Sequence, residues 1–181
     1  MKNIQVIINI VLLAGLLGIG GYQLIKKDKT VYVDVGLLMQ EYKGMKAARG
    51  EYEQKVAQWQ ANADTLIEKF QNEIKAYEKE RSKMTQREKE LKEELLRNKQ
   101  MQINQYQEAI QMKAREEEQL LTQNITNVVN DYVSEFGKSK GYKFILGATG
   151  QGNILYASES NNITQEIING LNNEWDIEHQ K

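Results

Sequence analysis

The middle of the chain carries apolar residues at helical spacing. From Tyr52 to Tyr77 they recur every three or four positions with a mean step of about 3.6, the period of one face of an α-helix. A second series runs from Ile103 to Phe136 with a mean step of about 3.7 and one charged interruption at Glu117. The pattern predicts two long amphipathic helices, and the wider second spacing argues against a long left-handed supercoil.

A polar zone separates the two series. Between Glu78 and Glu90 the only apolar side chain is Met84. Thr85 and Glu88 have the spacing of a capping box, which marks a helix start. We expect a break near 82–86 and two facing arms of about 60 Å each; the alternative is one helix of about 130 Å. The hairpin is favoured because it lets the two stripes face each other.

Short apolar runs at both ends of the chain predict strands. Residues 31–35 alternate with period two, and 142–146 and 154–157 are β-rich, with the loop 147–153 joining the last two as a hairpin. Thr164 or Asn162 should cap a last helix over 165–171. Three short strands are too few to be stable alone, so we expect strands from several protomers to build a shared core.

The predicted fold class is therefore mostly α with a small β body, and a long helical-hairpin arm, or tentacle, is inserted between strands. We expect four segments. They are 1–27, a signal sequence or anchor; 28–50, the first part of the body; 51–137, the arm with its tip near 82–86; and 138–181, the second part of the body. A helical turn at 37–39 should follow the first strand, Gly44 and Gly50 should mark the root of the arm, and Lys138, Lys140 and Gly141 should end it.

The N-terminal run 4–25 is mostly apolar and is flanked by Lys2 on one side and Lys26, Lys27 and Lys29 on the other. It is long enough to span a bilayer core of about 30 Å. It also has the basic start, apolar stretch and small residues of a secretory signal. Residues 4–25 are thus expected either to anchor the chain in a membrane or to be removed as a cleaved signal, and a buried core helix is the third and weakest interpretation.

Composition excludes most chemistry. The 181 residues include no Pro, no Cys and one His. A chain with so little His and Cys is unsuited to zinc sites or a Ser-His-Asp triad, and we expect His179 to lie in a disordered tail. The glycine-rich Gly147–Gly152 lacks the Lys-Ser/Thr of a phosphate-binding loop. With 24 basic and 25 acidic residues, nucleic acid is not an expected partner. We expect no enzyme activity and no cofactor.

Two groups of residues on the arm are candidates for binding. The first is a basic cluster at the predicted tip, which is either a solvated turn or a weak contact for anionic lipid head groups or acidic clients. Its members are Arg81, Lys83, Arg87 and Lys89. The second is a set of aromatic and methionine side chains, which either pack between the arms or offer an adaptable apolar surface to a non-native partner. Its members are Trp59, Phe70, Tyr77, Met84, Met101, Tyr106 and Met112.

The order of these parts resembles the Skp/OmpH-like family of periplasmic chaperones. The resemblance is carried by four segments around the helical region and covers about residues 31–175. They are Val31-Tyr32-Val33-Asp34-Val35-Gly36, Gly141-Tyr142-Lys143-Phe144-Ile145-Leu146, Ile154-Leu155-Tyr156-Ala157 and Asn162-Ile163-Thr164-Gln165-Glu166-Ile167-Ile168. Asn162 stands where the family usually has an acidic residue.

The resemblance implies a homotrimer with helical-hairpin arms around a cavity. It implies an ATP-independent holdase that binds unfolded outer-membrane proteins in the periplasm and prevents their aggregation before membrane insertion. One departure is charge: familiar members are strongly basic, whereas this chain is acidic once residues 1–27, with three lysines and no acid, are set aside. The alternative is a membrane-anchored coiled-coil protein that serves as a structural spacer or tether of the cell envelope.

Overall fold

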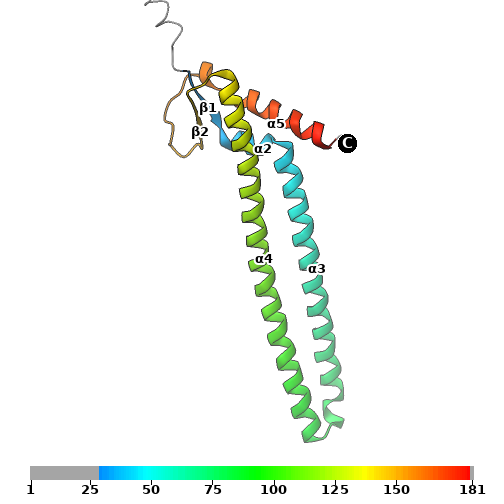
Figure 1. Cartoon of the computed structure of the whole chain (residues 1–181). Coiled ribbons are helices and arrows are strands. Elements are labelled where there is room, and N and C mark those ends of the chain that lie inside the picture. The colour runs from blue at the N-terminus through cyan, green and yellow to red at the C-terminus, as the bar shows by residue number, and fades with distance from the viewer. Residues whose placement is uncertain (1–28, 180–181) are drawn as a thin grey trace, which may run out of the picture. The chain divides into compact units, whose positions relative to one another are not determined.

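Two long helices dominate the part of the chain that the computed structural model describes, residues 29–179 (Figure 1). The predicted anchor or signal at 4–25 lies outside these residues. The elements in chain order are β1 (Thr30–Asp34), α2 (Val35–Glu41), α3 (Lys43–Glu80), the 3-10 turn η1 (Arg81–Lys83), α4 (Gln86–Lys140), β2 (Phe144–Ala148), the 3-10 turn η2 (Glu159–Asn161) and α5 (Thr164–His179). The predicted fold class, a mostly helical chain with a long hairpin between short strands, is confirmed.

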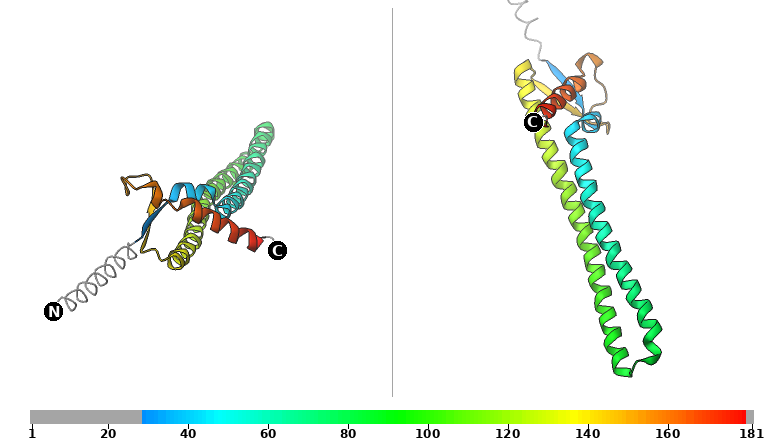
Figure 2. Two further views of the ribbon diagram at one scale, coloured as in Figure 1. Left: turned by 90° about the horizontal axis from the view of Figure 1, so that it is seen from above. Right: turned by 90° about the vertical axis from the view of Figure 1, so that its right-hand side faces the viewer.

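Helices α3 and α4 run side by side in both views of Figure 2 and reverse direction at the predicted break. The capping box is present: the Thr85 amide donates to Glu88 Oε2 over 2.7 Å, and the Glu88 amide donates to Thr85 Oγ1 over 3.4 Å. The alternative of one continuous helix is therefore wrong. Helix α3 begins at Lys43, before the predicted start of the arm, so Gly44 and Gly50 lie inside the helix.

The chain divides into two compact units. The first includes the described residues 29–38 and 132–170; the second includes 39–131 and 171–179.

In the first unit, β1 and β2 form a two-stranded parallel sheet in which Thr30 pairs with Phe144 and Asp34 with Ala148. The other edge of β1 is met by the segment before α5, where Tyr32 forms a bridge with Asn162 and its carbonyl accepts from the Ile163 amide over 3.0 Å. Strand β1 is thus central.

The predicted third strand at 154–157 is wrong, since the described residues between β2 and η2 contain no strand. Two features explain this. The Asn153 side chain folds the loop onto itself, accepting from the Thr149 amide and donating to the Gly147 carbonyl. Leu155 and Tyr156 are 93% and 89% exposed, so their side chains make little packing contact within the chain that would stabilise a strand here.

Helix α4 ends as the sequence predicts. Gly141 has φ +69°, the left-handed conformation that glycine adopts at least cost. Its amide donates to the Lys138 carbonyl, and the Tyr142 amide donates to the Gly137 carbonyl over 3.0 Å. These two bonds form a Schellman motif, which satisfies the last carbonyls and turns the chain into β2.

The core of the first unit combines the inward side of β1 with α5. Val31 and Val33 alternate inward along the strand, and Ile167 and Ile168 of α5 are almost completely buried. Thr164 is also buried; its hydroxyl accepts from the Asp34 amide over 2.8 Å, while its own amide donates to Asn162 Oδ1. Asn162 thus provides the predicted cap.

Helix α5 is longer than predicted and continues to His179. The expectation that His179 lies in a disordered tail is wrong: its ring stacks on Trp175 with centroids 4.0 Å apart, and Nδ1 lies 2.8 Å from the Trp175 carbonyl. The cause is their four-residue spacing, which places both rings on one side of the helix.

In the second unit, the hairpin core is narrow. The buried side chains are Ala63, Phe70 and Tyr77 on α3 and Ile125 on α4. They follow the predicted stripes. Among the elements of residues 29–179, the long helix packed against α3 is α4, and each of the two has this one long partner. Within residues 29–179, no helix combines the length and the apolar character that crossing a bilayer requires.

Two glycine substitutions should change stability in opposite directions. A Cβ at Gly170 in α5 would overlap the Tyr132 hydroxyl, so Gly170→Ala should destabilise the protein by about 1–3 kcal/mol. A Cβ at Gly50 in α3 meets nothing within 4 Å, so Gly50→Ala should stabilise by about 0.5–1 kcal/mol. Urea unfolding followed by circular dichroism measures both, and equal effects would contradict the packing at Gly170.

Candidate functional site

Polar and aromatic pairs join α3 to α4 along the hairpin. Lys55 Nζ lies 2.9 Å from Glu117 Oε2, and the Lys113 ammonium lies 4.7 Å from the centroid of the Trp59 ring. Farther along, Lys99 Nζ lies 2.6 Å from Glu73 Oε2. Each step forward along α3 is matched by an equal step back along α4, so the antiparallel register is regular.

The two ion pairs lie on the same side of the hairpin. Lys55 and Glu73 are about five whole turns apart on α3, as are Glu117 and Lys99 on α4. The charges are reversed between the pairs, with the cation on α3 in one and on α4 in the other. Both pairs are partly exposed, so each contributes roughly 0–1 kcal/mol and acts more on register than on stability.

A groove of about 320 Å³ lies between the helices on this side. Its apolar lining comes from Leu66 and Phe70 on α3 and from Ile103 and Tyr106 on α4, and the Glu73–Lys99 pair forms part of its wall. Leu66 is 40% exposed, whereas Phe70 is buried at the bottom of the groove. The groove thus exposes apolar surface beside fixed charges.

Apolar exposure continues along the same side of α4. Leu91 and Leu95 are 53% and 45% exposed and line a hollow that shares Lys99 and Gln102 with the groove. Toward the other end, Leu120 is 59% exposed and lines a hollow beside the Lys55–Glu117 pair. We call this surface the apolar flank. It consists of the groove and of the exposed leucines that lie in it or beside it, Leu66, Leu91, Leu95 and Leu120.

The predicted aromatic and methionine set is not brought together. Phe70 and Tyr77 are buried within the hairpin, which agrees with the packing interpretation. Trp59, Met84 and Tyr106 are half-buried. Met101 and Met112 are 55% and 62% exposed, but they lie about three turns apart on a side of α4 that faces away from Lys99.

The leucines of the apolar flank were not among the candidates predicted from the sequence, which were aromatic, methionine and basic side chains. The signal in the sequence that could have identified them as exposed is their angular offset from the centre of each apolar stripe. On α4, Leu91 and Leu95 are displaced around the helix from Leu96 and Ile103, which continue the buried stripe. In a two-helix hairpin, residues with that offset lie at the edge of the interface.

At the tip, only part of the predicted basic cluster is engaged. The Tyr77 hydroxyl donates to Glu93 Oε1 over 2.7 Å, and this bond, with burial, raises the pKa of Tyr77. Arg81 Nε donates to the same hydroxyl over 3.3 Å, and an Arg81 Nη atom lies 3.7 Å from Glu93. Lys83 and Arg87 are exposed and Lys89 is half-buried, so the cluster does not converge on one point.

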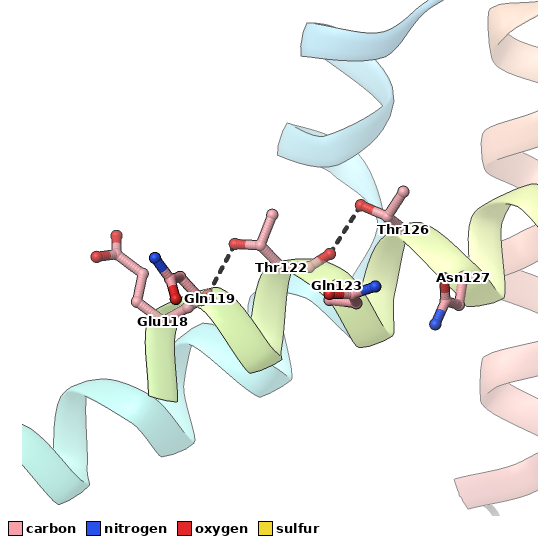
Figure 3. Close-up of a pocket in the computed structure, with 6 residues that line it drawn as sticks. All are labelled: Glu118, Gln119, Thr122, Gln123, Thr126 and Asn127. Carbon is pink, nitrogen blue, oxygen red and sulfur yellow. Dashed lines mark hydrogen bonds between the residues drawn. The ribbon is translucent and has the colours of Figure 1, made fainter. Parts of the chain in front are cut away.

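A further hollow, of about 550 Å³, follows one face of α4 (Figure 3). Its lining is polar and comes from one helix: Glu118, Gln119, Thr122, Gln123, Thr126 and Asn127. The Thr122 and Thr126 hydroxyls donate to the backbone carbonyls one turn earlier, over 2.9 and 2.7 Å. These hydroxyls therefore serve the helix rather than a ligand, and residues 29–179 contain no His/Cys/Asp/Glu group suited to a metal ion.

These features define a class of protein: a helical-hairpin protein with an exposed apolar surface along the hairpin. The chain belongs to the OmpH-like outer membrane protein family, whose family model matches residues 29–171. That segment contains the whole hairpin and both strands.

A solved structure has the same fold. The crystal structure of a candidate outer membrane chaperone (OmpH-like) from Caulobacter crescentus matches with a TM-score of 0.74 at 14% identity. The match covers 81% of this chain and 85% of that chain. At this identity the likeness concerns the fold. A search of curated proteins gives no match.

The turn between the arms should respond to acid. Hydrogen bonds from the Thr85 amide and hydroxyl lower the pKa of Glu88. The stabilisation is therefore complete above the unfolded-state pKa and is lost as pH falls through the folded pKa. The Thr85 amide should shift and exchange faster on acidification, as measured by NMR. Glu88→Gln should abolish the part of the Thr85 shift and exchange change that follows titration of the Glu88 carboxyl. If the Thr85 amide responds to acid equally in that variant, Glu88 is not the group responsible.

Proposed function

We propose that the protein is an ATP-independent holdase chaperone that binds unfolded outer-membrane proteins in the periplasm and prevents their aggregation before membrane insertion. The observation that carries the proposal is the apolar flank: a long arm with leucines 40–59% exposed beside a groove. Unfolded chains present apolar segments without a fixed shape, and an extended shallow surface can bind many of them weakly.

The sequence lacks the Lys-Ser/Thr of a phosphate-binding loop, which agrees with an ATP-independent role. The similar Caulobacter crescentus protein carries the description of an outer membrane chaperone, and family membership makes a related role reasonable here. We extend the periplasmic location from the same family, with residues 4–25 acting as either a cleaved signal or an inner-membrane anchor.

We also propose that the chain acts as a homotrimer. In the first unit, four large side chains are exposed near the small sheet: Phe144, Leu146, Leu155 and Tyr156 are 54%, 44%, 93% and 89% exposed. A two-stranded sheet is marginal alone, and association of protomers through these side chains would enlarge its core. Lys83 and Arg87 at the tip are proposed to give a weak additional contact with anionic membrane surfaces.

The chaperone proposal is tested by aggregation of an unfolded β-barrel outer-membrane protein diluted from urea. The purified protein should suppress light scattering at an equimolar ratio of trimer to client. Leu91→Ser with Leu95→Ser should weaken suppression about threefold or more, because two exposed apolar contacts are removed from the arm.

Ile177→Ser is the matched control, since Ile177 is 59% exposed on α5 and lies outside the apolar flank. It should leave suppression unchanged, and circular dichroism should show equal helix content in all variants. Absence of suppression by the unmodified protein would overturn the proposal and favour the envelope spacer, which has no affinity for unfolded chains.

The trimer is tested separately by equilibrium ultracentrifugation. The unmodified protein should sediment with three times the protomer mass, and Leu155→Ser with Tyr156→Ser should shift the equilibrium toward monomer because it removes apolar contact area. The Leu91 and Leu95 double variant is the control and should remain trimeric. A monomeric or dimeric unmodified protein would contradict the trimer without contradicting client binding.

A further inference from the structure

Helices α2 and α3 are separated by one non-helical residue. Tyr42 has φ −66° and ψ 122°, an extended conformation, and its side chain gives no cap to α3. A helix start leaves amide groups without intrahelical acceptors, and a helix end leaves carbonyls without donors. The bend at Tyr42 therefore leaves amides at the start of α3 and carbonyls at the end of α2 without intrahelical partners, and the Tyr42 side chain does not cap them.

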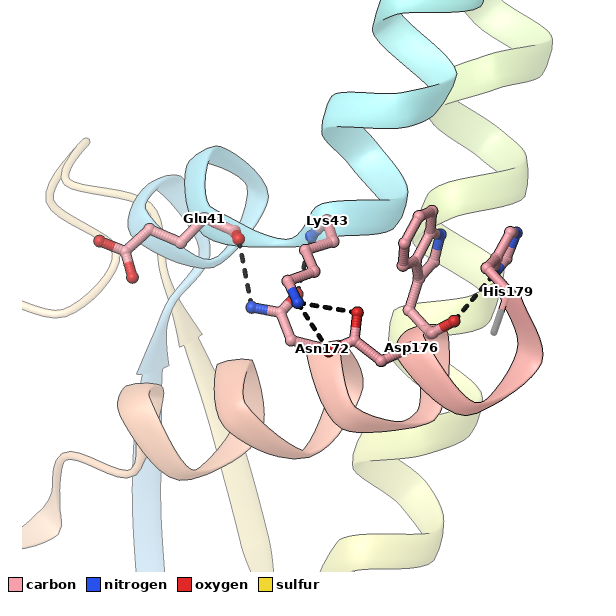
Figure 4. A network of polar contacts seen from close by, with 6 residues as sticks. Glu41, Lys43, Asn172, Asp176 and His179 are labelled. Atoms are coloured by element: carbon pink, nitrogen blue, oxygen red, sulfur yellow. Dashed lines mark hydrogen bonds and ion pairs between the residues drawn. The ribbon is translucent and has the colours of Figure 1, made fainter. Parts of the chain in front are cut away.

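One side chain of α5 forms hydrogen bonds with a backbone group on each side of the bend (Figure 4). Asn172 Oδ1 accepts from the Lys43 amide over 2.7 Å, and Asn172 Nδ2 donates to the Glu41 carbonyl over 3.3 Å. A carboxamide is suited to this because it offers an acceptor and a donor side by side. The first residue of α3 and the last residue of α2 are thus held by the same group.

A second contact follows one turn later on the same side of α5. Lys43 Nζ lies 2.7 and 2.6 Å from the two carboxylate oxygens of Asp176. Asn172 and Asp176 are four residues apart, the spacing that aligns side chains on a helix face. Lys43 is therefore held through both its backbone and its side chain.

The residue at the bend is itself packed. Tyr42 is 5% exposed, and a Cβ at Gly44 would overlap its ring, so the glycine makes room for the tyrosine. Burial, followed by the charges of Glu178 and Glu174 on α5, raises the pKa of Tyr42. The acidic end of α5 thus lies near the bend, in agreement with the hydrogen bonds.

These contacts come from a part of the helix outside the segment that defines the family. The family match ends at residue 171, whereas α5 continues without interruption to His179. Asn172 is the first residue beyond the match, and Asp176 lies beyond it as well. Leu171, at the boundary, is 1% exposed, so the extension starts from a fixed point.

We infer that the end of α5, Asn172–His179, is a strap that fixes the bend between α2 and α3 by holding Glu41 and Lys43 together. The strap suppresses fraying at the root of α3 and limits the range of angles that α2 and α3 adopt. It works through a hydrogen-bonded amide and an ion pair, with no covalent link. It does not depend on the chaperone function, because it concerns the protein without a client.

Amide hydrogen exchange of the full chain tests the strap. Asn172→Ala should speed exchange at the Lys43 amide by roughly three- to tenfold, the range expected when one hydrogen bond is lost. Asn169→Ala is the matched control, since Asn169 is an exposed asparagine of α5 that bonds only to Gln165 among the contacts described. It should leave exchange at Lys43 unchanged.

A conservative variant separates the strap from general damage to α5. Asn172→Asp keeps the acceptor for the Lys43 amide and loses the donor for the Glu41 carbonyl. It should restore slow exchange at Lys43, because a carboxylate at a helix start is favourable. Exchange as fast as in Asn172→Ala would show that this acceptor does not hold α3 and would overturn the inference.

The bend angle can be measured directly because the sequence contains no cysteine. Spin labels at the exposed positions Gln40 and Glu53 report the distance between α2 and α3. The distribution should be narrow in the full chain and at least twofold broader when the chain ends at Leu171. Equal widths, with unchanged exchange at Lys43, would overturn the strap even if the truncated protein remains an active chaperone.

Discussion

The parallel pairing of β1 with β2 is the constraint on which the rest of the chain depends. A parallel pair cannot be closed by a tight turn, so the chain must leave the end of one strand and return to the start of the next. Here α2, α3 and α4 make that connection. The hairpin reverses the chain, and α4, with 55 residues against the 38 of α3, is long enough to carry it back to the start of β2. The Schellman motif at Gly141 then directs the returning chain into β2.

A hairpin of two helices buries only part of the apolar stripe on each helix, and the rest of the stripe remains exposed as apolar surface. Each long helix has one long partner, so only the centre of each apolar stripe is buried, as at Ala63 and Phe70. Residues displaced from the centre, such as Leu66 and Leu95, are left at the edge. The apolar flank is thus a direct result of giving wide stripes a narrow interface, and the ion pairs beside it keep the two helices in register.

The sequence was sufficient for the hairpin because periodicity, the polar zone and the Thr85–Glu88 box are all local signals. It failed at 154–157, where β-rich composition did not reveal that Asn153 folds the loop onto itself. It also failed at the end of α5, because the contact between Asn172 and the bend joins positions far apart in the chain. The site was predicted only in part. The prediction selected residues by aromatic or methionine character, whereas the burial of Phe70 and the exposure of Leu91 depend on where each residue lies around its helix.

The reversed charges of the two ion pairs also bear on how the hairpin forms. If α4 met α3 five turns out of register, one direction of slippage would place Lys55 opposite Lys99, and the other would place Glu73 opposite Glu117. Both misalignments bring like charges together, although the apolar stripes would still match approximately. The order of the charges along the arm therefore favours the native register. In either shifted register, repulsion between like charges raises the free energy of the hairpin relative to the native pairing.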